Sequence, residues 1–202
     1  HGDDEDAMAV HEGIRSRYDA ASADSRLLLA VGRLAARKGY ASLLRAFAKV
    51  HASAPSVRLV IVGRGHLRSR LNRLAKSLGV GEAVHFESGM PFEELAELFR
   101  SADLVVYPSY YEGQGLIPLE AMASATPVVT VNHGPLPEMV DDSVGRLFTM
   151  ADETSMAAAI LTELDSDESL KKKGENGRRR VLENFTYEGN SERFEAIYGR
   201  AE

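Results

Sequence analysis

Short, mostly apolar runs alternate with amphipathic segments along most of this chain, and this alternation limits the folds that it can adopt. The runs span residues 27–31, 57–62, 83–86, 104–107 and 127–131, with a weaker one at 146–148. Strands that are apolar on both faces are typical of parallel sheets, which helices cover on both sides. We therefore expect an α/β fold built on a Rossmann-like, doubly wound parallel sheet of about six strands.

Between these runs, leucine and aromatic side chains recur at helical spacing. The expected helices include residues 40–50, 67–78, 92–99, 116–124 and 136–140, followed by 154–164, 168–185 and 187–198. Gly79 is a suitable residue for ending the second of them. The last three have no strand between them, so we expect a helical C-terminal segment beside the sheet.

The amino-acid composition limits the classes of function that this chain can have. The 202 residues are 44% hydrophobic, which is enough for a single sizeable core. The chain contains no cysteine, so it has no disulfide and no thiolate metal site, and we expect a cytoplasmic protein. Its net charge of −6 disfavours a general role in nucleic-acid binding. The six histidines show no metal-ligand spacing, and no apolar stretch is long enough to cross a membrane.

The chain starts with residues that cannot form a core, since positions 3–6 are all acidic. This start is typical of a tag remnant or of a cut made inside a longer protein. We therefore expect residues 1–25 to be a tag remnant or interdomain linker, outside the fold proper.

Two glutamates, Glu112 and Glu120, bracket a glycine-containing stretch that follows the run at 104–107 and opens a helix. In open α/β sheets, ligands bind beyond the carboxyl ends of strands and at helix N-termini. Glycines let a phosphate approach the backbone, and carboxylates accept hydrogen bonds from sugar hydroxyls. If Pro118 takes the first helical position, however, Glu120 lies in the first turn and can simply cap the helix.

Two cations, Arg33 and Lys38, follow the first strand at the same expected edge of the sheet. Arginine offers a planar fork to phosphate oxygens and lysine a compact charge, so the pair can hold a diphosphate without a metal. The alternative is a solvated loop with incidental charge. The basic clusters at 171–173 and 178–180 are most simply a solvated helical face, with a membrane or polyanion contact as the less favoured alternative.

The ordered set of motifs over residues 27–150 resembles the family 4 retaining glycosyltransferases. The motifs are Val31-Gly32-Arg33-Leu34 with Lys38-Gly39, Val62-Gly63-Arg64-Gly65, Ala102-Asp103, Tyr107-Pro108-Ser109, Glu112 through Glu120-Ala121-Met122-Ala123, Pro127-Val128-Val129, and Glu138 before Gly145. The resemblance implies the two-domain GT-B architecture, of which this chain would be the C-terminal, nucleotide-sugar-binding domain. Residues 26–185 would form the donor-binding domain, and residues 186–202 a helix that crosses to a missing N-terminal acceptor domain.

The resemblance also implies roles for individual residues. Arg33 and Lys38 would hold the diphosphate of the donor, Glu120 the ribose, and Glu112 the donor sugar. The expected catalytic residues are Arg33, Lys38 and Glu112, and the expected donor-binding residues are Gly32, Pro108, Ser109, Gly113, Gly115, Leu116, Ile117 and Glu120. The donor would be a UDP-, GDP- or ADP-sugar, with no cofactor and no metal.

The chain departs from the family pattern at three positions. Gln114 stands where an aromatic residue is common, and His66 where proline is more usual. Ala125 stands where glycine usually ends a helix, so left-handed geometry there would cost about 1 kcal/mol. These changes bear on the conformation of the local loops and on which sugar is bound. They leave the expected phosphate-binding residues intact.

The expected function is sugar transfer from a nucleoside diphosphate donor, with the isolated chain binding nucleotide weakly and transferring little. A nucleotide-sugar epimerase or phosphorylase of the same architecture is one alternative. A non-catalytic nucleotide-sugar-binding module is another. Membrane contact is expected only through the missing part, and nucleic acid is not an expected partner.

Overall fold

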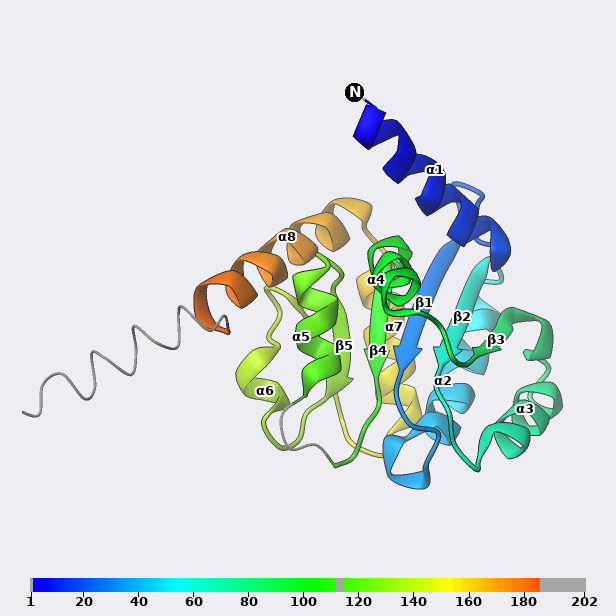
Figure 1. Cartoon of the computed structure of the whole chain (residues 1–202). Coiled ribbons are helices and arrows are strands. Elements are labelled where there is room, and N and C mark those ends of the chain that lie inside the picture. Colours follow the sequence, from blue (N-terminus) through cyan, green and yellow to red (C-terminus); the bar gives the residue numbers. More distant parts are fainter. Residues whose placement is uncertain (1, 112–114, 186–202) are drawn as a thin grey trace, which may run out of the picture.

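Six strands form a single parallel sheet in the computed structural model, which describes residues 2–111 and 115–185 (Figure 1). They are β1 (Arg26–Val31), β2 (Val57–Val62), β3 (Val84–Glu87), β4 (Leu104–Tyr107), β5 (Val128–Val131) and β6 (Gly145–Phe148). Each lies within a residue or two of the run that predicted it, including the weak one at 146–148. The prediction of a doubly wound sheet of about six parallel strands is confirmed.

The strand order is β3-β2-β1-β4-β5-β6, so the chain turns outward in opposite directions from β1 and from β4. Leu28 of β1 lies opposite Leu104 of β4, and the two neighbours run in parallel. A crevice opens at such a reversal point, where the connections that follow the two strands leave toward opposite faces of the sheet. The loops after β1 and β4 are therefore the two that can share a ligand.

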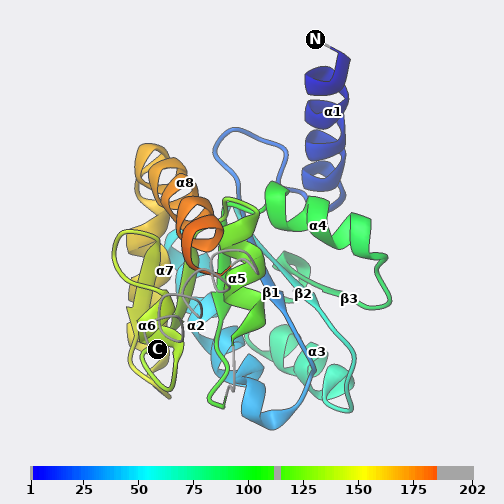
Figure 2. The same cartoon turned by 60° about the vertical axis from the view of Figure 1, so that its left-hand side comes forward.

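Helices cover both faces of the sheet (Figures 1 and 2). They are α1 (Gly2–Arg17), α2 (Tyr40–Ser53), α3 (Arg68–Ser77), α4 (Phe92–Ser101), α5 (Leu116–Ala123), α6 (Leu136–Met139), α7 (Glu153–Leu164) and α8 (Asp167–Asn184), with the 3-10 turns η1 (Ala36–Lys38) and η2 (Gly81–Ala83). Helix α2 packs against α3 and α7 on one face, and α5 packs against α4 and α8 on the other. The helix expected at 187–198 lies outside the described residues.

The apolar strands are buried as their composition predicts. Every residue of β4 and β5 is buried, and β1 and β2 each have a single half-buried position. At the edge of the sheet, β6 buries only its first and last residues, which explains why its sequence signal is weak. None of the described helices has the length and apolar character needed to span a membrane.

Part of the segment 1–25, expected to be a tag remnant or interdomain linker, packs with the rest of the described chain. Helix α1 packs against α4, and Ile14, Tyr18 and Ala20 join the hydrophobic core. The Arg15 guanidinium donates to the carboxylate of Asp103 at 2.9 Å and to the carbonyl of Ser25 at 3.0 Å, which ties the end of α1 to the amino ends of β1 and β4. The division of the chain into domains stays a prediction.

The basic clusters on α8 are not simply a solvated face. Lys173 donates to the carboxylate of Glu163 at 2.7 Å, and the Glu163 side chain is only 1% exposed. Arg180 pairs with Asp141 at 2.8 Å and also donates to the carbonyl of Met139. These two side chains fasten α8 to its neighbours, whereas Lys171 and Lys172 are exposed.

Ala125 adopts the left-handed geometry, with φ of 59°, that its place in the sequence suggested. We predict that Ala125→Gly raises the free energy of unfolding by roughly 0.5–1 kcal/mol. Release of about 1–2 kcal/mol of backbone strain exceeds the roughly 0.4–1 kcal/mol by which a more flexible glycine favours the unfolded chain. Urea titration followed by circular dichroism measures the change.

The matched control is Ala158→Gly, the same replacement at an exposed position inside α7. It should lower stability by about 1 kcal/mol, because glycine is a poor helix former. Equal losses from the two replacements would show that Ala125 is not strained.

Candidate functional site

The loop after β1 carries the predicted cations to the carboxyl edge of the sheet. The strand ends at Val31, Gly32 follows, and η1 leads into α2 through Gly39. Arg33 is exposed, and its side chain makes no hydrogen bond or ion pair with another described residue. Lys38 is half-buried, and its amino group donates to the hydroxyl of Tyr107 at 3.4 Å while lying 5.6 Å from the centre of that ring.

The loop after β4 lies against the loop after β1. Gly39 has φ of 70°, and a Cβ built on it would sit 2.1 Å from the carbonyl oxygen of Pro108, so only glycine permits this approach. The amide of Tyr110 donates to the carbonyl of Arg37 at 3.0 Å, and its hydroxyl donates to Ser42 of α2 at 2.7 Å. The two loops that the sequence assigned to one ligand therefore share one edge of the sheet and touch.

Pro108 and Ser109 are buried at this contact. Ser109 donates to the carbonyl of Tyr111 at 3.3 Å, which curls the chain back before residue 112. The predicted site residues Glu112 and Gly113, and the unusual Gln114, lie outside the described residues.

Helix α5 begins at the same edge without a side-chain cap among the described residues. Gly115 precedes it with φ of 62°, and a Cβ there would lie 2.5 Å from the methyl group of Met139 in α6. The amides of Leu116 and Ile117 open the helix, so they belong to the N-terminal groups that have no partner within it. Such amides, with the positive end of the helix dipole, favour an anion.

Glu120 is not the capping residue that the alternative interpretation expected. The helix starts at Leu116, which makes Pro118 its third residue and Glu120 its fifth, beyond the first turn. The residue is exposed, and its carboxyl group makes no hydrogen bond with any other described residue. Partial desolvation by the surrounding protein nevertheless raises the pKa of Glu120. Its carboxylate oxygens can thus accept hydrogen bonds from a ligand at the edge of the site.

The described part of the site gathers Gly32, Arg33, Lys38, Pro108, Ser109, Gly115, Leu116, Ile117 and Glu120 on the connections that follow β1 and β4. Sequence reasoning missed the two tyrosines that join these connections, Tyr107 and Tyr110. Their signal is only a Tyr-Pro-Ser-Tyr stretch after an apolar run, which does not reveal partners in α2 and η1. In the described part of the chain, no group of His, Asp or Glu side chains could hold a metal ion.

Comparison with known proteins identifies the family. The family model described as glycosyl transferases group 1 matches residues 16–180. The chain belongs to this family. The group 1 match begins within α1, at the residue before Arg17, and ends within α8, so it includes all six strands and both connections of the site.

Similar proteins agree with this assignment. The chain is 39% identical over 166 residues to an MMP α-(1→4)-mannosyltransferase from Mycolicibacterium hassiacum, an alignment that covers 81% of the chain but 40% of that enzyme. A solved sucrose-phosphate synthase from Thermosynechococcus elongatus superposes with a TM-score of 0.80 and 32% identity, over 93% of this chain and 48% of that one.

A third comparison differs in coverage. The solved C-terminal domain of a group 1 family protein, LpcC from Francisella tularensis, has a TM-score of 0.74 and 25% identity, over 80% of this chain and 87% of that one. The chain therefore spans about two fifths to one half of the longer relatives, and most of this separate domain.

Proposed function

We propose that this chain is the C-terminal, donor-binding half of a retaining family 4 glycosyltransferase that transfers a sugar from a nucleoside diphosphate donor. The observation that carries the proposal is the contact between the loops after β1 and β4, which brings Lys38 to Tyr107 and Gly39 to Pro108 beside the uncapped start of α5. The match to a separate C-terminal domain supports the assignment to that half.

In this proposal, the cations and the helix start hold the diphosphate from two sides. Departure of the nucleoside diphosphate builds negative charge on its oxygens as the bond to the sugar breaks. Arg33, Lys38 and the first amides of α5 would stabilise that charge electrostatically in positions fixed before the reaction. The protein needs no metal for this step, since two cations and a helix dipole act on the same anion.

Glu120 would bind the ribose hydroxyls, and Glu112 the donor sugar. A carboxylate that is partly desolvated and lacks a described partner can accept hydrogen bonds from two ribose hydroxyls. The base would be that of a UDP-, GDP- or ADP-sugar. The rest of the active site would come from an N-terminal domain that supplies the acceptor.

The first test removes the charge of Lys38. We predict that Lys38→Ala weakens the binding of nucleoside diphosphate at least tenfold, because a charge-assisted hydrogen bond contributes about 1.5–3 kcal/mol. A thermal-shift panel with uridine, guanosine and adenosine diphosphates selects the nucleotide, and calorimetry gives its dissociation constant. Lys172→Ala removes the same charge from α8 and should leave the affinity unchanged. Equal affinity in the Lys38 variant and the native chain would refute the role of Lys38.

The second test separates ribose from phosphate. For Glu120→Gln we predict weaker binding of the nucleotide with unchanged binding of inorganic pyrophosphate, measured by calorimetry on both ligands. Because burial raises the pKa of Glu120, the carboxylate forms only above that raised value, so nucleotide affinity should fall as the pH decreases through it. The glutamine variant should lose this pH dependence. Parallel losses for both ligands would contradict a ribose contact.

The third test concerns the missing half. The 202-residue chain alone should bind nucleotide weakly and transfer little or no sugar, because the acceptor and the closed cleft require the other domain. Product analysis of the chain, alone and fused to an N-terminal GT-B domain, measures transfer. Robust transfer by the isolated chain would overturn this part of the proposal.

The same product analysis separates the rival activities. An epimerase would convert the nucleotide sugar without an acceptor, and a phosphorylase would require a lysine-bound cofactor. A non-catalytic module would bind the donor but leave it intact even in the fusion.

A further inference from the structure

Charge is strongly segregated along this chain, although the net charge of −6 conceals it. No aspartate or glutamate occurs between Asp24 and Glu82, and this stretch holds 12 of the 24 lysine and arginine residues. Arg33 and Lys38 belong to the proposed donor site, but most of the other cations do not. The neighbouring helices α2 and α3 lie entirely within this acid-free stretch.

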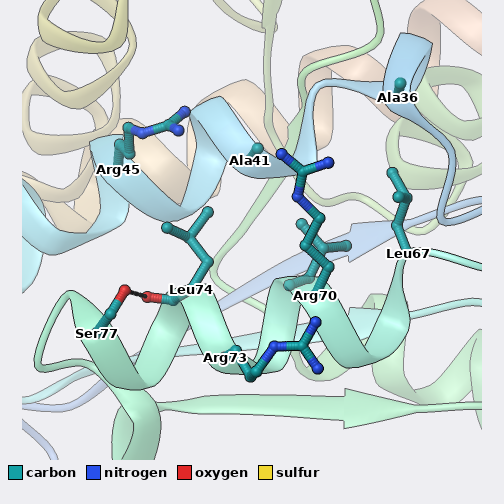
Figure 3. Close-up of a pocket in the computed structure, with 9 residues that line it drawn as sticks. Ala36, Ala41, Arg45, Leu67, Arg70, Arg73, Leu74 and Ser77 are labelled. Carbon is teal, nitrogen blue, oxygen red and sulfur yellow. Dashed lines mark hydrogen bonds between the residues drawn. The ribbon is translucent and has the colours of Figure 1, made fainter.

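Between these two helices lies a hollow of about 610 Å³, shown in Figure 3. It is called here the arginine groove, and its main lining residues are Ala41, Arg45, Arg70, Leu71, Arg73 and Leu74. The volume falls within the roughly 300–1,000 Å³ of typical small-molecule sites. One end of the groove, at Ala36 of η1 and Leu67, borders the carboxyl edge of the sheet, but none of the predicted donor-site residues lines it.

The inner part of the groove is apolar. Leu71 is buried at 2% exposure, and Leu67 and Leu74 are partly buried against the core. Ala41 stands opposite them on α2, and its small side chain leaves space that a larger residue would fill. The hollow can therefore accept an apolar group against these side chains.

Arginines stand at the mouth of the groove. In Figure 3, the guanidinium groups of Arg45 and Arg70 extend toward the position of Ala41 from opposite sides. The side chains of Arg70 and Arg73 make no hydrogen bond or ion pair with another described residue, and both residues are exposed. Arg45 pairs with Glu153 at 3.3 Å, but both side chains are substantially exposed, so this pair holds Arg45 only weakly.

We propose that the arginine groove binds an amphiphilic phosphate ester, with its apolar part against the leucines and its phosphate on Arg45, Arg70 and Arg73. Guanidinium groups bind phosphate through paired, charge-assisted hydrogen bonds. Repulsion among three cations without a nearby carboxylate on α2 or α3 is relieved when a dianion binds. The apolar inner surface distinguishes this ligand from inorganic phosphate or a bare diphosphate.

The phosphate ester has two possible sources, a free phosphorylated metabolite or the headgroup of an anionic phospholipid. Calorimetric titration of the 202-residue chain with soluble dihexanoyl phosphatidic acid tests the shared chemistry, and titration with inorganic phosphate tests the need for the apolar part. Sedimentation with phosphatidylcholine vesicles, with and without phosphatidic acid, tests presentation by a membrane.

We expect saturable binding of the soluble ester, binding of inorganic phosphate at least tenfold weaker, and a loss of about tenfold or more in the double variant Arg70→Gln/Arg73→Gln. The matched control, Lys171→Gln/Lys172→Gln, removes the same charge from exposed positions of α8 and should retain the affinity. Co-sedimentation only with phosphatidic acid vesicles would assign the headgroup as a source, and its absence would assign the free ester.

A second variant tests the groove without changing any charge. Ala41→Leu places a larger side chain between the arginines, so it should weaken the ester and leave nucleotide binding unchanged. Lys38→Ala should leave ester binding unchanged, which separates this site from the donor site. The proposal is overturned if the soluble ester does not bind, if inorganic phosphate binds equally well, if the α8 control loses as much affinity as the groove variant, or if folded Ala41→Leu binds as the native chain does.

Discussion

The parallel pairing of β1 with β4 is the constraint on which the rest of the carboxyl edge depends. Because these strands are neighbours in space but far apart in sequence, the connections that follow them end side by side. Contact between Gly39 and Pro108 then requires a residue without a side chain at one position. Tyr110 adds a second link, from the loop after β4 to η1 and α2. The spacing of the cations from the start of α5 is thus fixed by backbone packing, before any ligand is present.

The sequence predicted the parts of this arrangement that rest on local pattern. Buried strands such as β4 and β5 are apolar on both faces, so their number and parallel direction could be inferred without contacts. The left-handed geometry of Ala125 also followed from its place after a helix. The start of the helix expected at 116–124 is also where the structure has it, whereas the alternative interpretation assumed that Pro118 takes the first helical position, which is a preference and not a rule. The interpretation of Glu120 as a cap rested on that assumption.

Other features of the structure depend on contacts between distant residues, which a local sequence pattern does not reveal. The acidic start of the chain gave no sign that Ile14 of α1, and Tyr18 directly after that helix, pack into the core. Among three consecutive lysines, only Lys173 reaches the buried carboxylate of Glu163, since adjacent helical positions point about 100° apart. The segregation of basic from acidic residues was visible in the sequence, but the net charge of the whole chain does not report it. A count by segment would have shown that β1, α2, β2 and α3 carry no carboxylate.

Charged side chains with and without partners are distributed unevenly over the described structure. Remote from the carboxyl edge, the buried Glu163 pairs with the half-buried Lys173, and the half-buried Arg15 pairs with Asp103. At the edge, by contrast, Arg33 and Glu120 project charges that no described residue balances, and α5 begins without a side-chain cap. The more buried charges are thus paired, whereas Arg33 and Glu120 have no described partner where the two connections meet. The strained Ala125 follows the far end of α5, away from this edge, so its cost is one of stability, whereas the charges without a described partner lie where the proposed donor would bind.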